Sequence, residues 1–423
     1  MDIVSIYAQF IASTGVSTDT RTVKAGNLFF ALKGPNFNGN LYAKKALESG
    51  AAYAIIDEEK YKISENYILV DDVLIALQKL ANYHRKQLKC TFIGIAGSNG
   101  KTTTKELTFA VLSKKYKTFA TKGNLNNHIG VPLTLLSIGN EIEMAIIELG
   151  ANHVGELAEL CKIAEPDLGV VTNIGLDHLE GYGSIEGVAE GNSEIYYWLF
   201  KNGGKVFVNA QDEWLIRMTS RFESRILYND FAAFDFISSE SKKIFLTISS
   251  KNGLFRNTNL TGKYNLDNIN TAVKIGTHLG VDLEFCMDAI AEYQPANNRS
   301  QVIKKGTNEI ILDCYNANPS SMSKSLQSFA ELESNSKYVF LGDMFELGNF
   351  SDQEHLNILK TVEELNIKYA YFCGEAFCKH KLLFPKYNFF EKRENLILPR
   401  IEESLVLIKG SRGMTMEKIV EIL

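Results

Sequence analysis

The stretch FIGIAGSNGKTTTKE, Phe92 to Glu106, places a glycine-bracketed turn between an apolar run and a run suited to a helix. The apolar run, Thr91 to Ala96, predicts a buried strand, and we expect a helix to begin at Lys101. A turn of this kind aims backbone N–H groups and a helix N-terminus at an anion. The Lys101 ammonium can then reach the terminal phosphates of a nucleotide, and the Thr102 hydroxyl can ligate Mg²⁺.

The turn is a shortened form of the phosphate-binding pattern G-x-x-x-x-G-K-[ST]. Ile95 stands where the full pattern has its first glycine. A plain strand–turn–helix corner is the alternative interpretation. We favour a phosphate cradle because the strand, the turn, the lysine and the hydroxyl residue stand in register. The residues expected to hold the nucleotide here are Gly97, Ser98, Asn99, Gly100, Lys101, Thr102 and Thr103.

Composition sets the class of protein. A chain of 423 residues with 45% hydrophobic and 22% charged residues is typical of a soluble globular protein with two to four domains. The net charge of −5 argues against a general nucleic-acid binder. The N-terminus lacks the basic region of a signal peptide, no apolar run approaches the ~20 residues that span a bilayer, and the cysteines show no metal-ligand spacing. We therefore expect a cytoplasmic protein with reduced cysteines and no membrane contact.

Strand and helix patterns divide the chain into three α/β segments, residues 1–89, 90–295 and 296–423. In the middle segment, continuous apolar strands alternate with helices, which predicts a mostly parallel sheet covered on both faces. We expect an antiparallel appendage within residues 225–260. The predicted fold is thus α/β with three domains: a central P-loop ATPase domain with a parallel sheet, a small N-terminal α/β domain and a C-terminal Rossmann-like domain.

Two polar residues stand just past strands of the middle segment. Glu148 follows the apolar residues MAII of the strand Met144 to Leu149, and its carboxylate suits Mg²⁺, which prefers oxygen ligands. His178 follows the strand Leu168 to Asn173 and could contact a metal or a phosphate. Alone, each is more often a solvated or packing residue. We favour function because the carboxyl ends of parallel strands, where ligands bind, would place both beside the phosphate loop.

Two groups of asparagines are ambiguous from spacing alone. Asn124, Asn126 and Asn127 precede an apolar helix start, where they could bind a substrate or make turns. Asn265 and Asn268 stand at the head of another helix, where they could face a nucleotide base or act as caps.

Several motifs together resemble the Mur ligases. AGSNGKTTTKE, GNLNNHIGVP, IELGANHVGEL, TNIGLDHLEGYGS and GKYNLDNINTA follow one another in the family's order. The first segment is similar to the uridine-nucleotide-binding domain of the members that act late in the pathway. In the third segment DCYNANPSSM, LGDMFELG and VLIKGSRGMTME are similar to the member that adds a dipeptide, and no DNPR-like motif of the diamino-acid-adding member is found. The resemblance covers nearly the whole chain.

The resemblance implies an ATP-dependent amide ligase of peptidoglycan synthesis, with ATP and Mg²⁺ as cofactors. The terminal carboxylate of UDP-MurNAc-tripeptide would form an acyl phosphate, which the amine of D-Ala-D-Ala then attacks; we expect a monomer. Lys101, Glu148 and His178 would be catalytic, and the metal would be held by Thr102, Glu148 and His178. The remaining residues implied by the family are Asn268, Arg299 and Asp313 for the nucleotide, Thr20 and Arg21 for the uridine nucleotide, Asn126 and Asn127 for a substrate, and Asn316, Asn318, Phe345 and Glu346 for the dipeptide.

One position departs from the family. Asn192 stands where the family usually has a lysine that carries CO₂ as a carbamate and helps to bind Mg²⁺. This departure keeps open a nucleotide-binding regulator that has lost catalysis, although Lys101, Glu148 and His178 argue against it. A folylpolyglutamate-type ligase is disfavoured by the uridine-type first segment, and a non-enzymatic scaffold leaves the polar strand-end residues unexplained.

Overall fold

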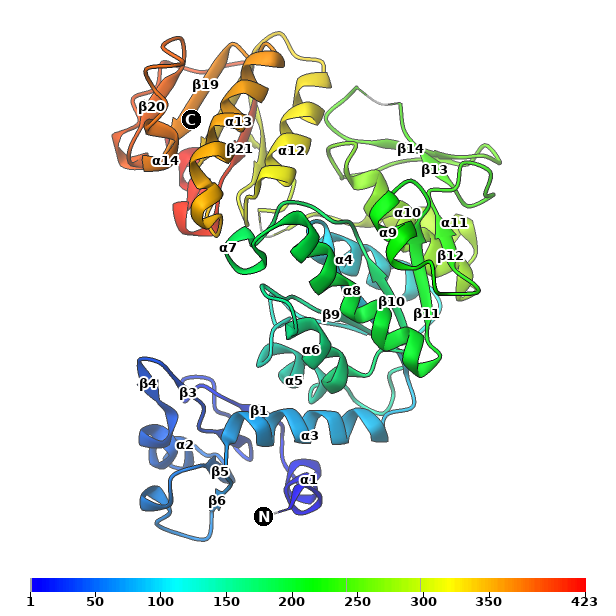
Figure 1. The fold of residues 1–423 in the computed structure, drawn as a ribbon, viewed down its shortest axis with the longest axis vertical. Helices are drawn as coiled ribbons and strands as arrows, with labels where there is room; N and C mark the ends of the chain where they lie inside the picture. Colours follow the sequence, from blue (N-terminus) through cyan, green and yellow to red (C-terminus); the bar gives the residue numbers. More distant parts are fainter. Residues whose placement is uncertain (1, 241, 297) are drawn as a thin grey trace.

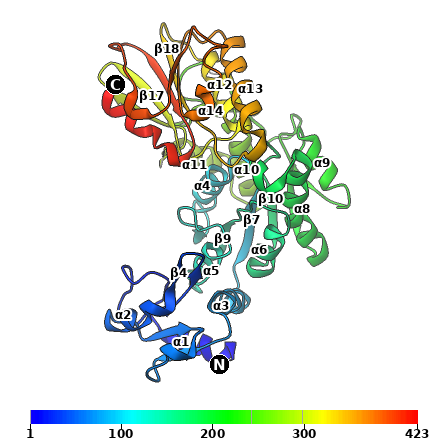
Figure 2. The same cartoon turned by 60° about the vertical axis from the view of Figure 1, so that its left-hand side comes forward.

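The protein consists of three units stacked along its long axis (Figure 1; Figure 2). The computed structural model describes residues 2–240, 242–296 and 298–423. In Figure 1 the N-terminal unit is blue and lies at the bottom, the middle unit runs from cyan to green, and the C-terminal unit is yellow to red at the top. Each unit contains one principal sheet, as expected for an α/β protein.

The N-terminal unit has a four-stranded parallel sheet in the order β1-β2-β5-β6. The apolar runs 28–32, 51–56 and 67–70 predict strands, which are present as β2, β5 and β6 with shorter bounds, and the helix predicted over residues 73–87 is confirmed. The sequence also predicts a helix over residues 41–49; its first part is a 3-10 turn, Gly39–Tyr42, and the α-helix begins at Ala43. The elements are α1 (Ile3–Ala12), β1 (Val16–Ser17), β2 (Leu28–Phe30), the hairpin β3–β4 (Lys33–Gly34, Phe37–Asn38), α2 (Ala43–Glu48), β5 (Tyr53–Ile56), β6 (Tyr67–Leu69) and α3 (Val73–Gln87).

The middle unit contains a six-stranded sheet in the order β12-β11-β10-β7-β9-β8, and every pair in it is parallel, which confirms the predicted sheet. The strands are β7 (Thr91–Ala96), β8 (Thr118–Ala120), β9 (Met144–Glu148), β10 (Leu168–Val171), β11 (Lys205–Asn209) and β12 (Ile226–Tyr228). The expected antiparallel appendage is present as β13 (Ile237–Ser238), β14 (Thr247–Ser250) and β15 (Phe255–Asn257). Its predicted start was wrong, because β12 joins the parallel sheet.

Helices cover both faces of this sheet because alternate strand residues point to opposite sides. Ile93 and Ile95 of β7 pack into one core, whereas Phe92 and Ala96 pack into another. The helices are α4 (Lys101–Leu112), α10 (Asn265–His278) and α11 (Leu283–Glu292) on the first side, and α5 (Gly130–Leu135), α6 (Glu156–Ala164) and α8 (Ile185–Asn202) on the second. Two shorter helices, α7 (Leu179–Tyr182) and α9 (Glu213–Met218), complete the unit.

The C-terminal unit has a second six-stranded sheet in the order β16-β17-β21-β18-β19-β20. Only β16 is antiparallel to its neighbour, and neither this edge strand nor β20 was predicted from the sequence. The strands are β16 (Gln301–Lys305), β17 (Asn308–Asp313), β18 (Lys337–Gly342), β19 (Tyr369–Cys373), β20 (Asn388–Phe390) and β21 (Leu405–Lys409). The helices are α12 (Pro319–Glu331), α13 (Ser351–Glu364) and α14 (Glu375–Cys378), with short 3-10 segments that include η3 (Gly348–Phe350) and η6 (Met416–Ile422).

The units are joined in two different ways. Helix α3 packs against α5 and α6, so the N-terminal and middle units share one hydrophobic core. The middle and C-terminal units meet through α7, whose Leu179 belongs to the core of the C-terminal unit and which contacts η3. Among the described residues, no helix combines the length and apolar character needed to cross a bilayer. The junction at α7 lies beside the carboxyl ends of the middle sheet, where the polar residues gather.

Candidate active site

The loop between β7 and α4 has the geometry of a phosphate cradle. Gly97 adopts a φ of +121°, and a Cβ there would lie 2.2 Å from the Thr172 Oγ1 atom. Gly100 adopts a φ of +80° directly before α4, and a Cβ there would lie 2.3 Å from the Asn268 Oδ1 atom. Both positions therefore require glycine, and the loop delivers the N-terminus of α4 to the sheet edge.

Neighbouring loop residues hold this cradle in place. The Gly175 backbone N–H donates to the Ser98 hydroxyl (2.9 Å), and the Thr172 hydroxyl donates to the Asn99 carbonyl (2.6 Å). The half-buried Lys101 ammonium folds back and donates to the Gly97 carbonyl (2.5 Å). When an anion enters the loop, the Lys101 ammonium can exchange the Gly97 carbonyl for a phosphate oxygen.

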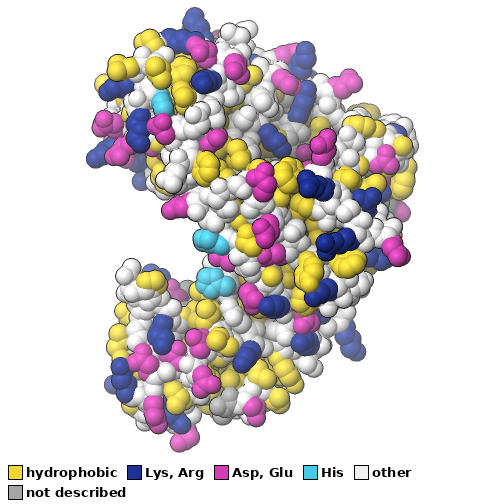
Figure 3. Space-filling model, in the orientation of Figure 1, with side chains coloured by type: hydrophobic (Ala, Val, Ile, Leu, Met, Phe, Trp, Pro, Cys, Tyr) yellow, Lys and Arg dark blue, Asp and Glu magenta, His cyan; other side chains and the backbone are white. Residues whose placement is uncertain are grey.

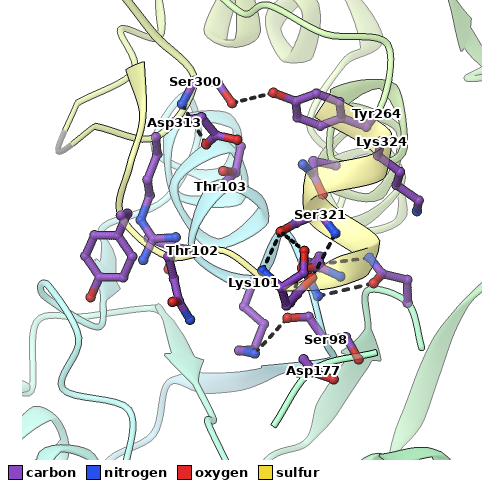
Figure 4. Close-up of a pocket in the computed structure, with 18 of the residues that line it drawn as sticks. Ser98, Lys101, Thr102, Thr103, Asp177, Tyr264, Ser300, Asp313, Ser321 and Lys324 are labelled. Atoms are coloured by element: carbon purple, nitrogen blue, oxygen red, sulfur yellow. Dashed lines mark hydrogen bonds between the residues drawn. The ribbon is translucent and has the colours of Figure 1, made fainter. Parts of the chain in front are cut away.

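A cavity of about 240 Å³ opens in front of the loop, between the middle and C-terminal units. In Figure 4, Lys101 and Thr102 at the start of α4 lie across from Ser321 and Lys324 of α12. Most of the predicted site residues line this one cavity, although they come from many parts of the chain. They are Ser98, Asn99, Gly100, Lys101, Thr102, Thr103, Asn126, Glu148, His178, Asn268, Arg299, Asp313, Asn316 and Asn318.

Four other predicted residues lie near the cavity without lining it. Gly97 shapes the turn behind it. Asn127 makes a local turn, because its side-chain oxygen accepts from the Ile129 and Gly130 backbone N–H groups. Glu346 reaches the site through His178, and Phe345 is exposed on the same loop.

Thr20 and Arg21 lie in the N-terminal unit, away from this cavity. The guanidinium of Arg21 is exposed and pairs with Asp19 at 2.5 Å, which lowers the pKa of that carboxyl to about 2. The space-filling view shows a deep notch between the N-terminal unit and the rest of the protein (Figure 3). A ligand held at Arg21 must therefore extend across the molecule to reach the phosphate loop.

Glu148 is the best-buried acid of the cavity, with 2% of its surface exposed. Its Oε1 atom accepts from the Thr102 hydroxyl (3.1 Å) and from the Asn126 amide (2.8 Å). Asn126 thus orients the carboxylate, whereas its neighbour Asn127 does not. Among the described residues, no three His, Cys, Asp or Glu side chains come close enough together to hold a metal on their own.

His178 is paired with an acid from the other unit. Its Nδ1 atom lies 2.8 Å from the Glu346 Oε2 atom, and the hydrogen bond lowers the pKa of the Glu346 carboxyl. Both residues have left-handed backbone conformations, with φ of +46° and +63°. The Glu180 backbone N–H also donates to the Glu346 carbonyl (3.1 Å). In this conformation His178 therefore bridges the two units.

The C-terminal wall of the cavity is built around Asp313 and Arg299. The Lys409 ammonium lies 2.5 Å from one Asp313 oxygen, and the Ser300 backbone N–H donates to the other (3.3 Å). The Arg299 guanidinium stacks on the Tyr315 ring at 3.5 Å from its centre. The Asp313 carboxylate and two cations, Lys409 and Arg299, thus stand together on the wall opposite the phosphate loop.

Several residues that line the cavity were not predicted from the sequence. Lys409 stands at a strand end and Asp177 directly precedes His178, so the strand-end rule that found Glu148 could have found both. Asn173 ends the predicted strand Leu168 to Asn173 and carries the same signal, whereas the others lie in loops and helices with no comparable signal. The missed residues are Asn173, Asp177, Tyr264, Asp267, Ser300, Tyr315, Ser321, Lys324 and Lys409.

Two further asparagines can now be placed. Asn268 accepts from the Thr104 hydroxyl (3.1 Å) and donates to the Asn265 side chain (2.8 Å), and both asparagines line the cavity. Asn192 on α8 does not line it; its amide donates to the Val188 carbonyl (2.9 Å), and only 6% of the residue is exposed.

A glycine loop that leads into a helix at the carboxyl edge of a parallel sheet, with a buried acid beside it, defines a P-loop nucleotide-binding protein. The comparison with known families is specific. The sequence profile of the Mur ligase middle domain matches residues 95–276, that of the "Mur ligase, glutamate ligase domain" matches 298–412, and that of the "Mur ligase family, catalytic domain" matches 13–85. The chain belongs to the Mur ligase family.

Similar proteins span nearly the whole chain. The UDP-N-acetylmuramoyl-tripeptide–D-alanyl-D-alanine ligase of Bacillus subtilis is 35% identical, over 96% of this chain and 92% of its own. The enzyme of the same name from Escherichia coli is 32% identical, over 98% and 94%. A crystal structure of MurF from Acinetobacter baumannii superposes with a TM-score of 0.85 at 29% identity, over 99% of this chain and 98% of its own. That of MurF ligase from Thermotoga maritima in complex with ADP gives 0.84 at 25% identity, over 98% and 97%.

Proposed function

We propose that this protein is an ATP-dependent ligase that joins D-Ala-D-Ala to UDP-MurNAc-tripeptide during peptidoglycan precursor synthesis. The carboxylate of the tripeptide is activated as an acyl phosphate, and the dipeptide amine then displaces phosphate to form an amide. The observation that carries the proposal is the full-length similarity to ligases of that name, 35% identical in Bacillus subtilis and 32% in Escherichia coli. We further propose that it acts in the cytoplasm as a monomer.

The middle unit supplies the phosphate-handling groups. The loop N–H groups and Lys101 hold the β- and γ-phosphates, because removing charge from the transferring group is the main demand of phosphoryl transfer. The Thr102 hydroxyl and the Glu148 Oε1 atom, 3.1 Å apart on the cavity wall, are oxygen donors that fit Mg²⁺. When bound there, Mg²⁺ neutralises phosphate charge. Once its bond to Glu346 is broken, His178 serves as a further contact to the metal or to a phosphate.

The other groups hold the substrates in place. Asn268, Arg299 and Asp313 bind the nucleotide, Thr20 and Arg21 bind the uridine nucleotide, and Asn126 orients Glu148 on the cavity wall. Asn316, Asn318, Phe345 and Glu346 bind the dipeptide. Asn127 stabilises the turn that precedes α5 instead of binding a substrate. Proximity of the bound groups then supplies much of the rate enhancement. We propose residues 1–89, 90–295 and 296–423 as the three domains that bring them together.

The test is phosphate release in the presence of UDP-MurNAc-tripeptide, ATP and D-Ala-D-Ala, with each component omitted in turn. Release that requires all three, together with an amide product found by mass spectrometry, supports the proposal. Release from ATP alone, or nucleotide binding without turnover, rejects it in favour of a hydrolase or a regulator.

A further inference from the structure

Lys105 is a lysine buried inside the middle unit, with 1% of its surface exposed. It stands one turn after Lys101 on α4 and does not line the cavity. Lysine is almost never fully buried unless its charge is paired. The partner of Lys105 is Glu148, because the ammonium Nζ atom lies 3.4 Å from the carboxylate Oε2 atom. A second acid, Glu106, lies 3.5 Å away on the same helix and is considerably more exposed.

The two oxygens of Glu148 have different surroundings. Oε1 accepts hydrogen bonds from Thr102 and Asn126, both of which line the cavity. Oε2 faces Lys105 in the interior, and no directed hydrogen bond reaches either Oε2 or the Lys105 Nζ atom among the described residues. The contact between them is therefore a buried ion pair, and it distinguishes the interior oxygen from the oxygen that serves the cavity.

We infer that Lys105 is a positioning residue of the metal–nucleotide site, an inference that rests on the proposed function. The ammonium attracts Oε2 from the side opposite the cavity and so keeps Oε1 beside the Thr102 hydroxyl. Because Lys105 lies outside the cavity wall, it acts only through Glu148 and does not contact the nucleotide. Groups that orient a metal-binding carboxylate in this way commonly change metal affinity or activity by roughly 10- to 100-fold.

Removing the ammonium would leave Glu148 without its charged partner in a buried position, which is a costly arrangement. The carboxylate would then rotate toward water or a bound cation. Its Oε1 atom would no longer be held beside the Thr102 hydroxyl. The expected defect is confined to the metal-dependent part of nucleotide binding, because Lys101 and the loop N–H groups remain in place.

The experiment measures the affinity of the full-length protein for AMP-PNP, a non-hydrolysable ATP analogue, by calorimetry in EDTA and in Mg²⁺. For the wild type we expect Mg²⁺ to tighten binding. In Lys105→Met the affinity in EDTA should stay within about twofold of wild type, while the gain from Mg²⁺ falls roughly 10- to 100-fold. Lys105→Arg, which keeps the charge, should recover part of the gain. Glu106→Gln, which removes the other acid beside Lys105, should keep all of it.

The outcomes separate this inference from a structural role and from the proposed function. A Lys105→Met protein that melts at a lower temperature but keeps the full Mg²⁺ gain overturns the inference and leaves the proposed function standing. If Lys105→Met does not fold, Lys105→Gln, which keeps a donor without the charge, replaces it under the same criterion. A wild type with no Mg²⁺ gain and no phosphate release overturns both.

Discussion

The two walls of the cavity are constructed differently. On the middle-unit wall, Glu148 is almost fully buried, Lys105 is buried behind it, and side chains of the same unit hold the carboxylate on both of its oxygens. The C-terminal wall is held to the first by α7 and by a few polar contacts at its border. These include the Asn318 amide bonded to Asn99 (2.9 Å) and the Leu176 N–H bonded to Ser320 (2.7 Å). The first wall is preorganised for phosphate, and the second is attached to it in a way that allows closure and release.

The largest expected effect is on the preorganised wall. Lys101→Ala should lower turnover by about 10³-fold, roughly 4 kcal/mol, since the charge of the transferring phosphoryl group then has one compensating donor fewer. Its melting temperature should stay close to that of the wild type. The matched control is Lys114→Ala, which removes a lysine just beyond the same helix, where it pairs with Glu292. Near-normal turnover of Lys101→Ala would contradict the assignment of this loop.

The second prediction probes the C-terminal wall. Asp313→Asn should weaken ADP binding by about 1.5–3 kcal/mol, the range for hydrogen bonds that involve a charged group, and calorimetry would measure it. Glu309→Gln on the same strand serves as control, because that acid pairs only loosely with Lys304 at 3.8 Å. A loss of turnover in Asp313→Asn as large as that of Lys101→Ala would show that the two walls do not differ in importance.

The third prediction asks whether the middle-unit wall lacks a metal ligand because Asn192 replaces the lysine. An amide cannot form a carbamate, and the carboxylate of Glu194, two positions along the same helix, already accepts from the Gly155 and Ala158 N–H groups. We predict that Asn192→Lys, assayed in bicarbonate buffer, reaches half-maximal rate at a several-fold lower magnesium concentration than the wild type. Unchanged magnesium dependence and unchanged turnover would show that no metal ligand is missing.

Closure of the second wall should be visible in solution scattering. We expect the radius of gyration to fall when AMP-PNP and UDP-MurNAc-tripeptide bind, because the substrates are assigned to different units. Glu346→Gln should increase the ligand-free radius by weakening the bond to His178. Lys386→Ala, which breaks an ion pair with Glu363 inside the C-terminal unit, should not. Equal radii with and without ligands would argue that the wall is fixed.

The smallest predicted effect concerns the stability of the C-terminal unit. Burial lowers the pKa of His355, and its Nε2 atom accepts from the Met344 N–H (3.0 Å), which requires the neutral ring. Such a group contributes stability above its unfolded pKa of about 6.5. That stability is lost as the pH falls below this value. The loss should appear as a lower melting temperature at pH 5.5 than at pH 7, and His355→Gln should show a weaker pH dependence.

Local patterns predicted the elements on which the site stands. The strand Thr91–Ala96 and the helix from Lys101 follow from apolar runs and glycine positions, and both were confirmed. Long-range contacts were not accessible in this way. Asn126 and Asn127 are adjacent and chemically identical, yet only tertiary packing decides that one orients Glu148 and the other makes a turn. The pairing of His178 with Glu346 joins residues 168 positions apart, for which one sequence offers no signal.

Helix α3 fixes the distance between the N-terminal unit and the middle unit. Its 15 residues extend about 22 Å, and its apolar face is sealed into the same core as the sheet that bears the phosphate loop. In the proposed function the uridine end is anchored in the N-terminal unit, so that anchor and the phosphate loop stay a constant distance apart. A donor whose peptide is too short cannot present its carboxylate at the loop while its nucleotide stays bound. The fixed distance between the N-terminal unit and the phosphate loop would then favour precursors whose peptide is long enough over shorter ones.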